Sequence, residues 1–91
     1  MPPRKLQFTS KFEKDYLRMA RRGKNMDKLD EAVRLLEKGD GLPQSYRDHA
    51  LTGEWKDCRD IHLEPDWLLL YALGNDWVRL VRTGTHADLF R

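Results

Sequence analysis

Three histidines and an aspartate in the second half of the chain carry side chains suited to acid–base chemistry. His49, His62 and His86 are the only histidines, and Asp66 follows His62 by four residues. Each histidine lies in a polar or turn-like context, outside any apolar run. An imidazole has an unperturbed pKa of about 6.5, so it can give or take a proton at cellular pH. The set can therefore supply both a general acid and a general base.

Cleavage of RNA is a reaction that these groups could perform without a metal or another cofactor. The ribose 2′-hydroxyl is the nucleophile, so a base removes its proton, an acid protonates the departing 5′ oxygen, and positive charge stabilises the pentavalent phosphate. The four residues above are the candidate catalytic groups. Two arginines could brace the phosphate and two aromatic residues could stack on a base, which adds Arg59, Arg82, Trp67 and Phe90 as supporting candidates.

A solvated surface and a zinc site are the alternatives that these residue types leave open. Three histidines in a chain of 91 residues are not unusual, and histidines with an aspartate also suit zinc. However, no His-x-x-x-His pair or other tight spacing fixes a ligand geometry, so no metal site is predicted. Cys58, the lone cysteine, cannot form an intrachain disulfide, and we predict that it packs rather than reacts.

The first half of the chain predicts a strand followed by two helices. Residues 5–9 alternate between polar and apolar side chains, as in a short edge strand. Ser10 and Glu13 have the spacing of a capping box, which predicts a helix over residues 10–22. A second helix over residues 26–38 ends at a glycine. The short connection between them predicts an antiparallel helical hairpin.

The second half predicts a loop and a sheet. Residues 39–53 contain few apolar side chains, so they are predicted to form a loop with one helical turn. Three strands, 55–63, 67–73 and 77–83, are separated by turn-forming residues and predict an antiparallel meander. The middle strand is apolar on both faces, which is typical of a central strand covered by helices on one side.

The tail, 84–91, is predicted to be a loop from which Leu89 and Phe90 can tuck back. One domain over residues 1–91 follows from the length, and the predicted fold class is α+β: an N-terminal strand, an antiparallel helical hairpin and a three-stranded antiparallel meander.

The charge distribution predicts a polyanionic or protein partner. The net charge is only +2, but basic residues prevail in the first half of the chain, and one face of the first predicted helix is more basic than solubility requires. No apolar stretch approaches the ~20 residues of a membrane span, and the N-terminus has no secretory signal, so we expect a cytoplasmic protein without a membrane partner. The basic face consists of Lys11, Lys14, Arg18, Arg21 and Arg22.

Three runs in the second half carry a family resemblance. Residues 46–56, 59–71 and 82–90, which include Asp66-Trp67 and Gly84-Thr85-His86, resemble the YafQ branch of the RelE/ParE toxin superfamily. The resemblance implies the toxin of a type II toxin–antitoxin pair: an endoribonuclease that enters the A site of the 70S ribosome, cuts mRNA and stops translation. A ParE-like gyrase inhibitor of the same fold, without nuclease activity, is the alternative.

The resemblance also implies roles for individual residues. His86 is expected to be the general acid and Asp66 the general base, while His49 and His62 orient the RNA or stabilise charge. Trp67, Arg82 and Phe90 match supporting positions. The expected products are a 2′,3′-cyclic phosphate, or the 3′-phosphate formed by its hydrolysis, and a 5′-hydroxyl. The basic helix face is expected to contact 16S rRNA, and a cognate antitoxin is expected to wrap the toxin.

Overall fold

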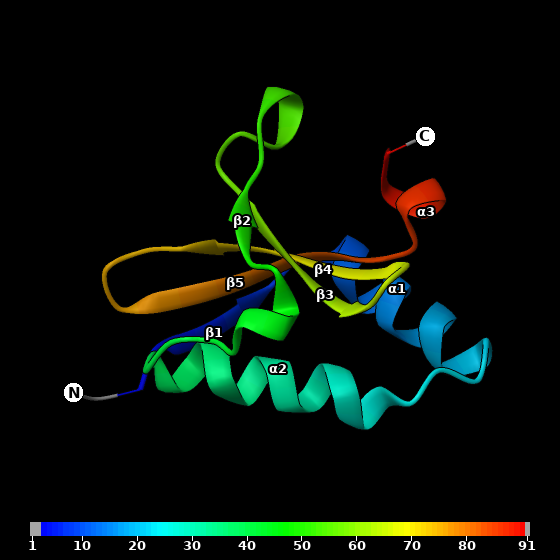
Figure 1. The fold of residues 1–91 in the computed structure, drawn as a ribbon, viewed down its shortest axis with the longest axis horizontal. Coiled ribbons are helices and arrows are strands. Elements are labelled where there is room, and N and C mark those ends of the chain that lie inside the picture. The colour runs from blue at the N-terminus through cyan, green and yellow to red at the C-terminus, as the bar shows by residue number, and fades with distance from the viewer. Residues whose placement is uncertain (1–2, 91) are drawn as a thin grey trace.

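A five-stranded sheet organises the chain, and the computed structural model describes residues 3–90 of it. The strand order is β1-β5-β4-β3-β2 (Figure 1). The elements in chain order are β1 (Lys5–Phe8), α1 (Ser10–Arg21), α2 (Met26–Lys38), the 3₁₀ turn η1 (Gln44–Tyr46), β2 (His49–Ala50), the 3₁₀ turn η2 (Gly53–Trp55), β3 (Arg59–Glu64), β4 (Trp67–Leu73), β5 (Trp77–Gly84) and α3 (His86–Phe90).

The sheet confirms the α+β class and the predicted meander. Strands β3, β4 and β5 pair antiparallel in succession. The N-terminal strand β1 pairs parallel with β5 at one edge, and the two-residue strand β2 pairs antiparallel with β3 at the other edge. The sequence did not predict β2, because a two-residue strand has no periodicity to detect.

Both predicted helices form, with one correction at the start of α1. The N-cap is Thr9 rather than Ser10: its hydroxyl oxygen accepts the Phe12 N–H at 3.0 Å. The same hydroxyl donates to the Val81 carbonyl at 2.7 Å, which ties the cap to β5 and explains why it lies one residue earlier. The helix α2 ends as predicted at Gly39, whose φ of 78° is the left-handed conformation that glycine adopts without strain.

The main core lies between the sheet and the two helices. Figure 1 shows α2 running along one face of the sheet. Phe12 and Met19 of α1 and Leu29 and Leu36 of α2 are buried there, each pair on one face of its helix. Alternate residues of the central strand, including Trp67, complete this core.

The other face of the sheet carries α3 and η2 (Figure 1). Leu68 and Leu70 point to this face and are covered by Leu89 of α3, so the tail does tuck back through Leu89, whereas Phe90 stays 42% exposed. Two predictions were wrong here: the tail is a helix rather than a loop, and β3 begins at Arg59 because Trp55 belongs to η2. This second face is where the candidate site is built.

No helix among the described residues is both long and apolar enough to cross a membrane.

Candidate functional site: a row of three imidazoles

The three histidines line up on the face of the sheet that carries α3. The ring centroids of His49 and His62 are 6.1 Å apart, and those of His62 and His86 are 5.9 Å apart. The Phe90 ring follows at 6.2 Å from His86. His62 and His86 line a surface cavity of about 460 Å³. The structure thus brings together the histidines that the sequence singled out.

Strand register explains why these segments meet. His49 in β2 is paired with Asp60 in β3, and Asp60 lies on the same face as His62 because side chains alternate along a strand. His62 and Gly84 are paired with the same residue of the central strand, Leu68, from opposite sides. Because α3 starts two residues after Gly84, its first residue, a histidine, lies beside His62.

His86 is held by Asp66. The Asp66 Oδ1 atom lies 2.6 Å from His86 Nδ1 and accepts the His86 backbone N–H at 2.9 Å. The backbone bond has the larger effect and the side-chain bond the next, and both lower the pKa of Asp66 below its usual value. A carboxylate only accepts, so Nδ1 carries a proton. The remaining nitrogen of His86, Nε2, is then free to donate to a substrate when the ring is protonated.

His49 also turns its Nδ1 toward acceptors, but one of them is a backbone carbonyl and the other is the buried carboxylate of Asp60. Its Nδ1 bonds to the Arg47 carbonyl oxygen at 2.9 Å and also lies 2.9 Å from Asp60 Oδ1. Both neighbouring atoms are acceptors, so Nδ1 carries the proton of the neutral ring. The Nε2 atom of His49 therefore presents a lone pair, as a general base requires.

His62, in the middle of the row, differs from both neighbours. Its Nδ1 is buried and has no hydrogen-bond partner among the described residues. Leaving a buried N–H donor unpaired is costly, so the neutral ring places its proton on Nε2. His62 then presents an N–H donor to any anion that lies over the row.

Asp60 lies beneath the row and is a functional candidate that the sequence analysis missed. It is 3% exposed. Burial raises its pKa, while the positive charge of His49, His62 and His86 acts in the opposite direction. The signal was present in the sequence, because period-two alternation places residue 60 on the same strand face as residue 62. Asp60 is positioned to stabilise a protonated imidazole in the row.

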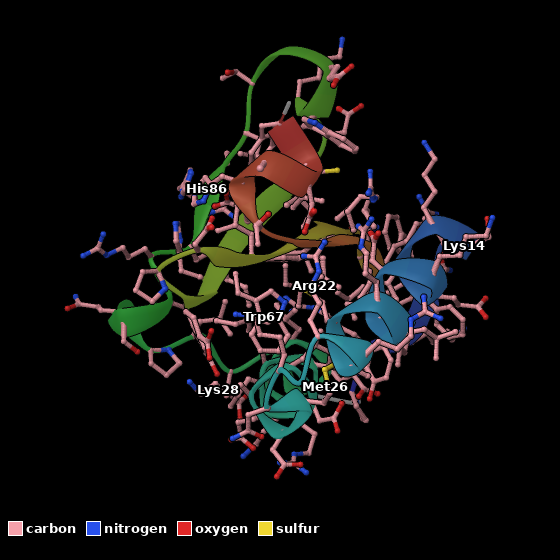
Figure 2. All side chains as sticks on the ribbon, turned by 90° about the vertical axis from the view of Figure 1, so that its right-hand side faces the viewer. Lys14, Arg22, Met26, Lys28, Trp67 and His86 are labelled. Carbon is pink, nitrogen blue, oxygen red and sulfur yellow. The ribbon has the colours of Figure 1, made fainter. Side chains whose placement is uncertain are left out.

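The expectation that Trp67 stacks on a base is wrong. Its side chain is fully buried in the main core, and its Nε1 donates to the Thr83 hydroxyl at 3.0 Å. Figure 2 shows Trp67 on the helix-covered side of the sheet, away from His86. Asp66 lies in the turn before β4, whereas alternation along β4 places Trp67 on the helix-covered face with Leu69 and Tyr71.

The expectation that Arg59 braces the phosphate is also wrong. Arg59 is paired in register with Tyr71, which belongs to the core on the helix side of the sheet. Its guanidinium donates two hydrogen bonds to Asp48, at 3.1 and 3.2 Å, and the Tyr71 hydroxyl donates to the same carboxylate. Arg59 therefore anchors the residue that precedes His49 and does not face the row.

Arg82 has a structural partner as well. Its Nε donates to Asp15 of α1 at 2.6 Å and its Nη2 at 3.2 Å. Asp15 is buried and also accepts the Thr83 backbone N–H. Arg82 is thus used to join α1 to β5, and this contact opposes its predicted role as a phosphate brace.

The basic face of α1 is smaller than predicted. Arg18 pairs with Asp15 at 2.8 Å, and Arg22 makes two hydrogen bonds with Asp88 of α3, at 2.8 and 3.1 Å. Figure 2 shows Arg22 on the side of α1 that faces the sheet and Lys14 pointing away from the body. The cations of this face without an ion-pair partner among residues 3–90 are Lys11, Lys14 and Arg21.

A capping box starts α3 and fixes the position of His86. The Thr85 hydroxyl accepts the Asp88 N–H at 3.1 Å, and the Asp88 carboxylate accepts the Thr85 N–H at 2.9 Å. The spacing Thr-x-x-Asp is the sequence signature of such a box, and it would have revealed this helix. The Arg22 pair then joins the box to α1.

The paired carboxylate of Asp88 should make the stability of the fold sensitive to acid. The hydrogen bonds from Arg22 and from Thr85 hold the pKa of Asp88 far below its usual value. A lowered native pKa stabilises the fold above the unfolded pKa of about 3.9, and this stabilisation is lost as the pH falls below it. We expect the Tm of the wild type to fall more steeply between about pH 5 and pH 3 than that of Asp88→Asn.

Circular dichroism melts across this range measure the difference. The matched control is Asp76→Asn, which alters a 67% exposed carboxylate whose Lys5 contact is 3.6 Å long; its pH dependence should follow the wild type. Parallel curves for wild type and Asp88→Asn would contradict the assigned role.

Metal ligation is a separate question for this site. Among residues 3–90, no group of three or more histidine, cysteine, aspartate or glutamate side chains is arranged to hold a metal ion.

Comparisons with known proteins identify the family of this chain. The family model described as the bacterial toxin of type II toxin–antitoxin system, YafQ, matches residues 4–91. The mRNA interferase toxin YafQ of Escherichia coli K12 is 43% identical over 91 residues, which are 99% of each chain.

Solved structures show the same fold. The crystal structure of YafQ from E. coli BL21(DE3) has a TM-score of 0.93 and 42% identity, and the match covers 97% of this chain and 99% of that one. YafQ in the E. coli DinJ–YafQ toxin–antitoxin complex has a TM-score of 0.91 and 42% identity, with 98% and 99% covered. The chain therefore belongs to the YafQ family, the mRNA interferase toxins of bacterial type II toxin–antitoxin systems.

Proposed function

We propose that this chain cuts mRNA in the ribosomal A site by metal-independent acid–base catalysis, with the ribose 2′-hydroxyl as the nucleophile. The observation that carries the proposal is the row of three imidazoles, whose rings are about 6 Å apart and whose hydrogen-bond partners differ. When its ring is neutral, His49 presents the Nε2 lone pair, His62 presents an N–H, and a protonated His86 is stabilised by the exposed carboxylate of Asp66. This order matches the base, the phosphate and the acid of RNA cleavage.

The contacts favour His49 as the base and His86 as the acid. The Nε2 lone pair of His49 takes the 2′-hydroxyl proton. His62, which lies between His49 and His86, donates a hydrogen bond to the scissile phosphate. His86 gives its Nε2 proton to the departing 5′ oxygen, and Asp66 stabilises the charged ring. The base role that the resemblance gave to Asp66 fits less well, because two hydrogen bonds from His86 lower the pKa of that carboxyl and weaken it as a base.

A pH–rate comparison tests this assignment. A bell-shaped profile reports one essential base and one essential acid. On the acidic side of the profile the wild-type rate should rise with pH, as the base loses its proton. We expect His49→Gln to lose this rise and to cut about 10²–10⁴-fold more slowly. Asp66→Asn should retain that rise at a lower rate. Loss of the rise in Asp66→Asn, with the rise kept in His49→Gln, would return the base role to Asp66.

The free cations of α1 are proposed to dock on 16S rRNA. Lys11, Lys14 and Arg21 have no ion-pair partner among the described residues, so their charge is available to phosphates. Replacing all three with glutamine should weaken cleavage of translated messages and make it less sensitive to added salt, because fewer counterions are released on binding. Lys38→Gln on α2, an exposed lysine 3.8 Å from Asp40, is the matched control. An unchanged salt dependence would refute the docking role.

A cognate antitoxin is the second proposed partner. The support is the E. coli DinJ–YafQ complex, in which a protein of this fold is bound to its antitoxin. Coexpression with the product of the neighbouring reading frame should yield a stable complex that no longer cleaves mRNA. A toxin that stays active and separate would contradict it, and inhibition of gyrase with intact mRNA would favour the ParE-like alternative.

A further inference from the structure

The proposed reaction needs a cation at the scissile phosphate, and both arginines predicted for that task have other partners. Arg59 is bonded to Asp48 on the opposite face of the sheet, and Arg82 is bonded to the buried Asp15. A pentavalent phosphate carries additional negative charge that a neutral His62 alone would not offset. Another positive group must therefore face the row.

We infer that Arg47 binds the scissile phosphate and stabilises its transition-state charge, an inference that rests on the proposed function. Arg47 lines the same surface cavity as His62 and His86. It is exposed, and no carboxylate of residues 3–90 lies within ion-pair distance of its guanidinium. Its charge is thus available to a ligand in the cavity.

The remaining cations near this cavity are already neutralised. Glu64, which also lines the cavity, is bonded to Lys24 at 3.0 Å and to Lys28 at 2.9 Å. These two bonds lower the pKa of Glu64 and keep its charge paired with the lysines. Arg47 is left as the cavity-lining cation without a partner within the described part of the chain.

The backbone of Arg47 is fixed even though its side chain is free. Its φ is 51°, and it is the one non-glycine residue among residues 3–90 in the left-handed region. Its N–H bonds to the Gln44 carbonyl at 3.0 Å, and its own carbonyl accepts the His49 Nδ1 proton at 2.9 Å. A non-glycine residue in a left-handed conformation is often found at functional sites. The turn that orients His49 therefore also places Arg47 at the cavity lined by His62 and His86.

The test must separate the charge of Arg47 from its backbone. Arg47→Gly keeps the left-handed turn without strain and removes the guanidinium, whereas Arg47→Lys keeps a positive charge. Arg79→Gln is the matched control, because Arg79 lies over Trp77 and bonds Gln7 near the β1 edge. Single-turnover cleavage of a ribosome-bound message is the readout, with thermal melts to show that each variant is folded.

We expect Arg47→Gly to cut about 10²-fold more slowly at saturating toxin, Arg47→Lys to recover at least a tenth of the wild-type rate, and Arg79→Gln to equal the wild type. Wild-type rates in a folded Arg47→Gly, or equal losses in the Gly and Lys variants, would overturn the role of Arg47 and leave the proposed function standing. A wild type that cuts no message would instead overturn the proposed function, and this inference with it.

Discussion

His86→Gln is expected to lower the single-turnover rate of mRNA cleavage by about 10²–10⁴-fold, the contribution of a positioned general acid. Glutamine is similar in reach and can still donate a hydrogen bond to Asp66, which lies 2.6 Å from the histidine ring in the native site. It cannot release a proton to the departing 5′ oxygen. The variant should therefore fold and bind the message normally while losing the chemical step.

A substrate with a sulfur in place of the departing 5′ oxygen makes this prediction specific. A thiolate leaves without protonation, so a missing general acid matters little for such a substrate. We expect His86→Gln to cleave the sulfur-containing message at nearly the wild-type rate, and His49→Gln to remain slow on both substrates. Equal losses of His86→Gln on both substrates would remove His86 from the acid role.

Trp67→Ala is expected to reduce the free energy of unfolding by about 3–5 kcal/mol, the usual cost of truncating a large buried aromatic residue. Trp67 is fully buried, and its replacement also removes the hydrogen bond that its indole N–H donates to Thr83. A small domain has only about 5–15 kcal/mol of stability in total, so this loss removes a large share of it. Loss of activity in Trp67→Ala would follow from unfolding rather than from a missing RNA contact.

Phe90→Ala is the matched comparison, because its ring is 42% exposed and lies 6.2 Å from His86. Its unfolding free energy should change by no more than about 0.5 kcal/mol, while RNA binding weakens by about 1–3 kcal/mol, the value of one stacked base. Urea denaturation and cleavage assays on both variants separate the two effects. A Trp67→Ala protein of wild-type stability that fails to cut RNA would restore the stacking role of Trp67.

The features that the sequence predicted correctly are those with a local signal. The glycine that ends α2 and the apolar run of β4 are each recognised from residues adjacent in the chain. The face on which a side chain lies also follows from period-two alternation, which would have placed Asp60 with His62 and turned Trp67 inward. Alternation thus identifies Asp60, which its residue type alone does not, and removes Trp67 from the residues that can contact RNA.

Partners distant in sequence were not predictable from any pattern. Arg82 is bonded to Asp15, which is 67 residues away in the sequence. Arg22 similarly pairs with Asp88, 66 residues away. An arginine that is free to bind a ligand and one that forms an ion pair look the same in the sequence. The pairing depends on strand register and on the packing of α1 against β5. The sequence therefore predicts more unpaired positive charge on α1 than the structure has, and it does not indicate that Arg47 is unpaired.

Cleavage of a message that carries a single 2′-deoxynucleotide on the 5′ side of the cut site tests the central claim most directly. Every role given to the imidazole row depends on the ribose hydroxyl as the nucleophile, with His49 accepting its proton. The account predicts that the all-ribose message is cut there in EDTA, leaving a 2′,3′-cyclic phosphate and a 5′-hydroxyl, and that the deoxy message stays intact at that position. Cleavage of both messages at the same rate would show that water or a protein group attacks instead, and would contradict the account.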